Sequence, residues 1–212
     1  MKKITIVSCI TLAIAGILMV SVAIADQSRE AVLKQFTPVE IEEIGKNVYQ
    51  TTGENTCLKC HRSGGEGEGW AGAADLRKPY KWNAFTTLGG YEALEKNPEE
   101  FRKKFYTILE ALAAEGGIKW NLNFKKTHPD IVMDWSKSEK KKTQYDMMMW
   151  GVAQAAVKKK IADIQKDLES KGKKLTDAEM KDLAVYAVMQ YIKGFEEPQK
   201  KPDGTSYPKI HA

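Results

Sequence analysis

The sequence predicts a mostly α-helical fold, because apolar residues recur at helical spacing in several segments and helix-start signals precede them. The 212 residues are 42% hydrophobic and 29% charged, an ordinary globular composition that excludes disorder throughout the chain. The expected helices lie near residues 38–50, 98–115, 152–170 and 176–194. We expect the first, second and fourth of these helices to form the core and the third to be an addition to it.

The first and last of these helices each begin at a capping box. Thr37-Pro38-Val39-Glu40 places proline at the first helical position, and Thr176-Asp177-Ala178-Glu179 has the same Thr-x-x-Glu spacing. Apolar residues follow on one face of each helix: Ile41, Ile44, Gly45, Val48 and Tyr49 in the first, and Met180, Leu183, Ala184, Ala187, Val188 and Tyr191 in the last. The two segments are therefore predicted to be amphipathic helices that pack on the core.

The two middle helices differ in the width of their apolar faces. Asn97-Pro98 opens one helix, Gly116-Gly117 stops it, and five residues share its apolar face: Phe101, Phe105, Ile108, Leu109 and Leu112. The other, near 152–170, has a narrower stripe of Val157, Ile161, Ile164 and Leu168. If this stripe packs on the protein's own core, the helix is an insertion; if it is exposed, the helix is a partner-binding or assembly surface.

The N-terminus has the pattern of a secretory signal peptide. Lys2 and Lys3 precede an uncharged apolar run from Ile4 to Ala25, which ends in Ala23-Ile24-Ala25. We expect cleavage after Ala25, with residues 1–25 as the signal and 26–36 as an N-terminal extension. An uncleaved run of this length would instead anchor the chain in a membrane. The expected location is the periplasm or an equivalent exported compartment.

The three cysteines, Cys9, Cys57 and Cys60, are too few for a disulfide-stapled fold or a four-thiolate metal site. Cys9 leaves with the signal, and the other two lie in Cys57-Leu58-Lys59-Cys60-His61. This C-x-x-C-H spacing indicates covalent haem attachment, because two thiols one helical turn apart can each bond a vinyl group while the histidine reaches the iron. A thioredoxin-like pair would need a strand where Thr51–Thr56 forms a polar loop, and a two-residue disulfide gives His61 no role.

The order of these features resembles a class I monohaem cytochrome c. In that family a first helix carries a glycine and, four residues later, an aromatic residue, as Gly45 and Tyr49 do here, and the haem motif follows. Leu183-Ala184-Val185-Tyr186 resembles the family's L-x-x-Y signature in the last helix, which crosses the first at the glycine. The resemblance implies one covalent haem c, anchored by Cys57 and Cys60 with His61 as the proximal iron ligand. A four-helix-bundle cytochrome would carry its motif in the last helix, and a multihaem protein would have a second motif.

The resemblance implies a methionine as the second iron ligand, and Met147 occupies that position in Met147-Met148-Met149-Trp150-Gly151. The thioether favours ferrous iron and raises the reduction potential. Met148, Met149 and His128 are the alternatives, followed by Met133 or an open site. His211 lies in a Pro/Lys-rich tail, so we expect it to be solvated.

These observations predict an electron carrier rather than an enzyme, with a cytochrome domain over residues 37–195 and a polar tail over 196–212. An alternative is a haem-bearing assembly or electron-transfer subunit of a larger exported oxidoreductase complex, and a third is a ligand-binding haem protein with an open site. Removal of Lys2 and Lys3 leaves 31 basic against 28 acidic residues, a charge of +3. This mild charge suits acidic redox partner proteins and gives no reason to invoke nucleic acid.

Overall fold

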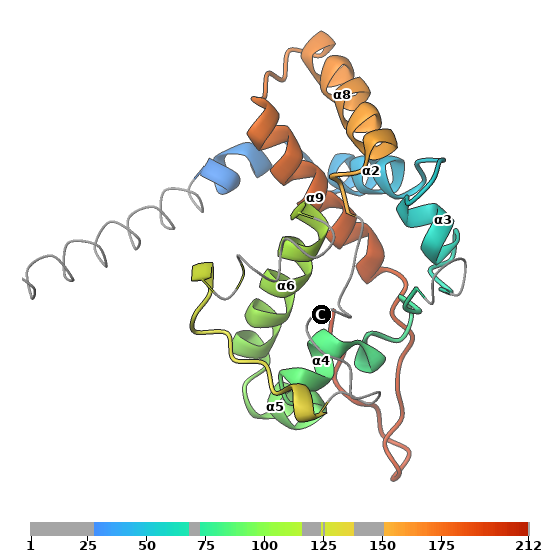
Figure 1. Ribbon diagram of the computed structural model, residues 1–212, viewed down its shortest axis with the longest axis vertical. Helices are drawn as coiled ribbons and strands as arrows, with labels where there is room; N and C mark the ends of the chain where they lie inside the picture. Colours follow the sequence, from blue (N-terminus) through green and yellow to red (C-terminus); the bar gives the residue numbers. More distant parts are fainter. Residues whose placement is uncertain (1–27, 68–72, 116–123, 125, 138–150, 212) are drawn as a thin grey trace, which may run out of the picture. The chain divides into compact units, whose positions relative to one another are not determined.

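The computed structural model describes residues 28–67, 73–115, 124, 126–137 and 151–211, and most of them lie in helices (Figure 1). The mostly α-helical prediction is confirmed for these residues, where strand-like pairing is limited to one bridge between Lys200 and Ser206. None of the helices in these ranges is long and apolar enough to cross a membrane. The predicted signal segment, 1–25, lies outside the described residues.

The chain divides into two compact units, Met1–Thr37 and Pro38–Ala212. In the first unit, residues 28–33 are helical, and Lys34 Nζ lies 2.9 Å from Glu30 Oε1. The second unit contains the elements α2 (Pro38–Tyr49), α3 (Cys57–His61), η1 (Pro79–Lys81), α4 (Asn83–Thr87), α5 (Gly90–Lys96), α6 (Pro98–Glu115), η2 (Trp135–Lys137), α8 (Ala155–Ser170) and α9 (Asp177–Lys193).

Helix α9 is the centre of the second unit and packs against α2, α6 and α8. It begins at the predicted capping box: the Thr176 hydroxyl accepts the Glu179 N–H, and the Glu179 carboxylate accepts the Thr176 N–H. Its buried residues extend beyond the predicted face, since Val185, Met189 and Ile192 are buried as well. A helix that is apolar on several sides packs against neighbours on several sides, as α9 does.

The crossing of α2 and α9 depends on Gly45. A Cβ at this position would lie 2.6 Å from the Ala187 carbonyl carbon and 3.0 Å from Tyr191 Cβ, closer than side chains pack in proteins. Glycine therefore lets the two helices approach backbone to backbone. The prediction that the last helix crosses the first at Gly45 is confirmed.

Helix α6 has the predicted bounds, and all five residues of its predicted apolar face are buried. Short helices α4 and α5 pack against it. The Phe85 ring of α4 meets Phe101 edge-on at 5.3 Å between centroids, and the Trp82 ring stacks on Phe105 at 5.9 Å. Aromatic packing thus joins the middle of the chain to α6.

Helix α8 packs on the protein's own core. Val157, Ile161 and Leu168 are buried against α2 and α9, and Ile164 is half-buried. The alternative of an exposed partner-binding stripe is therefore wrong, and the alternative that the stripe packs on the protein's own core is confirmed. The helix begins at Ala155 rather than near 152, because Gln154 has an extended backbone (φ −69°, ψ 144°). Before it, Gly151 adopts φ +53° and the Val152 N–H donates to the Ala113 carbonyl (2.8 Å).

Residues 195–211, which we call the C-terminal strap, leave α9, turn back at the Lys200–Ser206 bridge and end against Arg102 of α6 (red in Figure 1). The Glu196 carboxylate accepts the N–H groups of Ile210 (2.8 Å) and His211 (2.9 Å), and Arg102 of α6 donates to the carbonyls of Lys209 and Ile210. Ile210 is fully buried and His211 is 9% exposed. The prediction of a solvated tail histidine is therefore wrong, because paired backbone groups and an apolar neighbour bring His211 into the core.

Candidate functional site

The C-x-x-C-H motif forms one capped helical turn, α3. The Thr56 hydroxyl accepts the Lys59 N–H (3.3 Å) and donates to the Gly53 carbonyl (3.1 Å), and Thr56 is buried. The preceding residues form a loop rather than a strand, as predicted. Because residues three apart share one face of a helix, the turn brings Cys57 and Cys60 to the same side.

Both thiols are free, with Cys60 buried and Cys57 partly so. Burial raises the pKa of Cys57 to about 11, and burial also raises that of Cys60. A thioredoxin-like pair depends on a thiol whose pKa is lowered, so that a thiolate is present near neutral pH. The environment of Cys57 and Cys60 is the opposite of what that redox chemistry requires.

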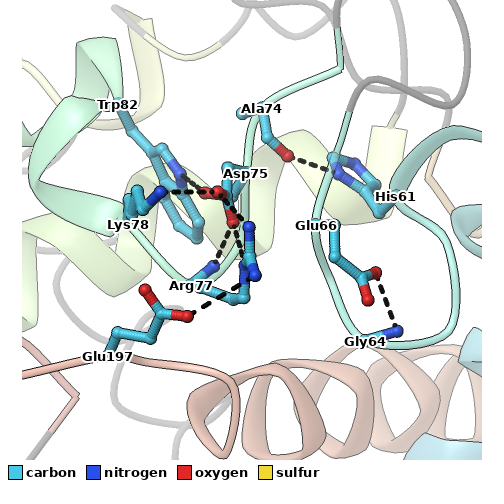
Figure 2. A network of polar contacts seen from close by, with 9 residues as sticks. All are labelled: His61, Gly64, Glu66, Ala74, Asp75, Arg77, Lys78, Trp82 and Glu197. Atoms are coloured by element: carbon cyan, nitrogen blue, oxygen red, sulfur yellow. Dashed lines mark hydrogen bonds and ion pairs between the residues drawn. The ribbon is translucent and has the colours of Figure 1, made fainter.

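His61, the last residue of α3, is oriented by a backbone carbonyl (Figure 2). Its Nδ1 lies 2.8 Å from the Ala74 oxygen, and since a carbonyl can only accept, Nδ1 carries the proton. Burial lowers the pKa of His61, and the bond to Ala74 opposes this effect. The imidazole is therefore neutral near pH 7, with the Nε2 lone pair as the one that can bind a metal, as in most metal-bound histidines.

Tyr49 ties the motif to the helix crossing. Its hydroxyl donates to the carbonyl of Arg62, the residue after His61 (2.7 Å), and its ring lies 5.3 Å from that of Tyr191 on α9. On α9, the aromatic residue that meets Tyr49 is thus Tyr191, five residues beyond Tyr186 of the Leu183–Tyr186 segment that resembles the family signature. Tyr186 itself is half-buried.

The predicted second ligand, Met147, lies outside the described residues together with Met148 and Met149. The segment that follows them is fixed on α6 through the Val152–Ala113 hydrogen bond. His128 has local contacts: its ring stacks on Phe124 at 4.6 Å, and its Nδ1 lies 2.8 Å from the Thr127 hydroxyl. Met133 is half-buried.

His211 lies in an aromatic environment that the sequence did not indicate. Its Nδ1 lies 2.8 Å from the Tyr106 hydroxyl, and its ring is within 6.0 Å of those of Trp82 and Phe105. Its Nε2 is buried without a hydrogen-bond partner among the described residues. Burial, with a smaller effect of the Lys193 charge, lowers the pKa of His211 to about 4, so the imidazole is neutral at physiological pH.

Sequence reasoning missed the groups around Ala74 as well as His211. Every residue has a carbonyl, so no motif identifies the one that orients His61. Beside it, no recognised sequence pattern is formed by Asp75, Arg77 and Trp82. The only hint of a buried tail was the apolar Ile210 next to His211 in an otherwise polar segment.

Comparison with known proteins gave no match to a family model, to a curated protein or to a solved structure. In the described residues there is also no cluster of three or more His, Cys, Asp or Glu side chains that could hold a bare metal ion. The local chemistry of α3 and its surroundings is therefore the basis for assigning function.

Proposed function

We propose that this protein is an exported class I-like monohaem cytochrome c that carries single electrons and transforms no substrate. The observation that supports it best is the C-x-x-C-H sequence on one capped helical turn, with the histidine held at Nδ1 by the Ala74 carbonyl. The thiols are not joined in a disulfide and the imidazole is neutral, which are the states that haem attachment and iron binding need.

Each residue of the motif has a separate role. Cys57 Sγ and Cys60 Sγ would each hold haem through a bond to a vinyl carbon, and the thiol hydrogen would end on the neighbouring vinyl carbon, so no oxidant would be consumed. His61 Nε2 would supply its lone pair to iron. Met147 Sδ is the proposed second ligand, with Met148, Met149 and His128 as alternatives. When bound, haem supplies a one-electron ferric–ferrous couple.

Expression of the full chain in a periplasm that contains a c-type haem maturation system tests the proposal. The mature protein should carry the mass of one haem and give no reaction with a thiol reagent under denaturing conditions. Replacing both Cys57 and Cys60 with serine should abolish covalent haem, whereas His128→Ala should retain it. A mature chain with two reactive thiols and no haem would contradict the proposal.

The second ligand is tested by substitution of each adjacent methionine in turn. Met147→Ala should remove the methionine-to-iron charge-transfer band of the ferric protein and open the iron to carbon monoxide in the ferrous form. Met148→Ala and Met149→Ala serve as matched controls and should retain the band. A wild-type protein that already binds carbon monoxide readily would favour the open-site alternative, and purification in a large complex would favour the subunit alternative.

A further inference from the structure

The carbonyl that orients His61 belongs to a short segment fixed on both sides. Ala74 is followed by Asp75, whose own carbonyl accepts the Trp82 indole N–H (2.9 Å). The Leu76 N–H donates to the Gly65 carbonyl (2.7 Å), which joins the segment to the loop after the motif. The peptide plane that carries the Ala74 oxygen therefore has little freedom to rotate while these bonds hold.

Arg77 makes side-chain contacts with both Asp75 and Glu197 (Figure 2). Its Nε and Nη2 donate to the two Asp75 carboxylate oxygens, each at 2.9 Å, and its backbone N–H donates to the same carboxylate (3.0 Å). This is a two-point fork, the geometry that arginine makes and lysine cannot reproduce. Lys78 Nζ adds a weaker contact to Asp75 at 3.4 Å.

The second side of Arg77 meets the C-terminal strap. Glu197 Oε1 lies 3.5 Å from Arg77 Nη1, and the Glu197 backbone N–H donates to the Arg77 carbonyl (2.9 Å). Two residues earlier, the Phe195 ring packs on Tyr49 with centroids 5.4 Å apart. The strap thus contacts Arg77 through the guanidinium nitrogen that Asp75 does not use, and the strap is itself packed on the helix that precedes the motif.

We propose that Arg77, held between Asp75 and Glu197, is a positioning residue that keeps the Ala74 carbonyl on His61 Nδ1 and thereby sets the reduction potential of the iron. This inference rests on the proposed function. A hydrogen bond at Nδ1 makes the imidazole a stronger donor at Nε2, and a stronger donor stabilises ferric over ferrous iron. Loosening the carbonyl should therefore raise the reduction potential.

Arg77→Lys is the decisive variant, because it keeps the charge and removes the fork to Asp75. Loss of the positive charge alone would stabilise ferric iron and lower the potential, so Arg77→Ala mixes two opposite effects and the lysine variant does not. In holoprotein carrying Arg77→Lys, the potential should rise, and the His61 Nδ1–H of the ferrous state should exchange with solvent roughly fivefold faster, as expected for one weakened hydrogen bond.

Lys201→Gln is the matched control. Lys201 lies on the same strap and pairs with Glu95 of α5 at 2.6 Å, outside the group of residues drawn in Figure 2. This variant should loosen the strap and leave the proton exchange unchanged, and its loss of one positive charge can shift the potential only downward. An upward shift of equal size in the control would show that general loosening of the strap is responsible, and it would overturn the role assigned to Arg77.

Two further outcomes separate this inference from the proposed function. A protein with covalent haem whose Arg77→Lys variant keeps the wild-type potential and exchange rate would overturn the inference alone. A protein that attaches no haem would overturn the proposed function, and the inference with it.

Discussion

Substitution of Gly45 by alanine is the most direct test of how α2 and α9 position the candidate site. The added Cβ would meet the Ala187 carbonyl group, with its carbon only 2.6 Å away, and Tyr191 Cβ at 3.0 Å. The Ala187 carbonyl is backbone inside a helix, so it cannot move aside as the end of a flexible side chain can. Relief therefore requires the two helix axes to move apart.

Two opposite effects decide the magnitude. Alanine in a helix interior is favoured over glycine by up to about 1 kcal/mol, whereas overpacking a close contact costs about 1–3 kcal/mol. Separation of the helices also weakens the packing of Tyr49 on Tyr191. Because the obstacle is backbone, we take the upper part of that range and expect a net loss of about 2 kcal/mol in the free energy of unfolding.

Gly194→Ala is the matched control, and urea unfolding followed by far-ultraviolet circular dichroism is the assay. Gly194 ends α9 with φ −64° and ψ −17°, and a Cβ there would lie 3.4 Å from the Tyr191 oxygen, an ordinary contact. We expect the control to be neutral or to gain a few tenths of a kcal/mol, roughly the propensity effect alone. If Gly45→Ala were as stable as the wild type, the close crossing described for α2 and α9 would be refuted.

Three further predictions concern His211, Thr176 and Tyr49. Burial lowers the pKa of His211 from 6.5 to about 4, so the unfolded chain binds a proton first and stability falls as the pH drops from 6.5 toward 4, by about 2 kcal/mol at pH 5. Urea titrations at pH 7 and pH 5 should show that His211→Phe lacks this loss, and equal losses in both proteins would contradict a buried neutral imidazole. Thr176→Ala removes the hydroxyl of the α9 capping box and should cost about 1 kcal/mol in the same assay, whereas Thr176→Ser should cost little. Tyr49→Phe removes the hydrogen bond to the Arg62 carbonyl and should lower the free energy of unfolding by about 1 kcal/mol. The backbone amides of α3 should also exchange faster with solvent. Unchanged amide exchange would show that this hydrogen bond does not hold the motif.

The helices could be predicted because each has a local signal that the fold does not override. Helix α6 begins at Pro98, as predicted, since proline is favoured at a first helical position and the apolar period continues from Phe101 to Leu112, about three turns. Helix α8 begins three residues later than the predicted start near 152, which followed directly after Gly151. Val152 instead donates its backbone N–H to Ala113, a partner far back in the chain that no local pattern indicates.

The C-terminal strap shows where composition misleads. Lysine, proline and acidic residues dominate it, and such a segment usually remains in solvent. Here Glu196 accepts two successive backbone N–H groups, and Arg102 donates to the two carbonyls beside them. Each of these contacts pairs a charged side chain with a backbone group. Neither the hydropathy of the sequence nor the spacing of its residues therefore predicts them.

The candidate site contains groups that a sequence motif identifies and groups that only the fold brings together. Thiols and an imidazole must be supplied by particular residue types at fixed spacing, so Cys57, Cys60 and His61 can be recognised from the sequence. The acceptor for His61 Nδ1 is a backbone oxygen, so the identity of Ala74 is immaterial to that hydrogen bond. What distinguishes this carbonyl from others is the side chains that hold its peptide in place, above all the Arg77 fork to Asp75. Changes that tune the site while leaving its motif intact should therefore be found at Arg77 and its partners rather than at the residue that accepts the bond.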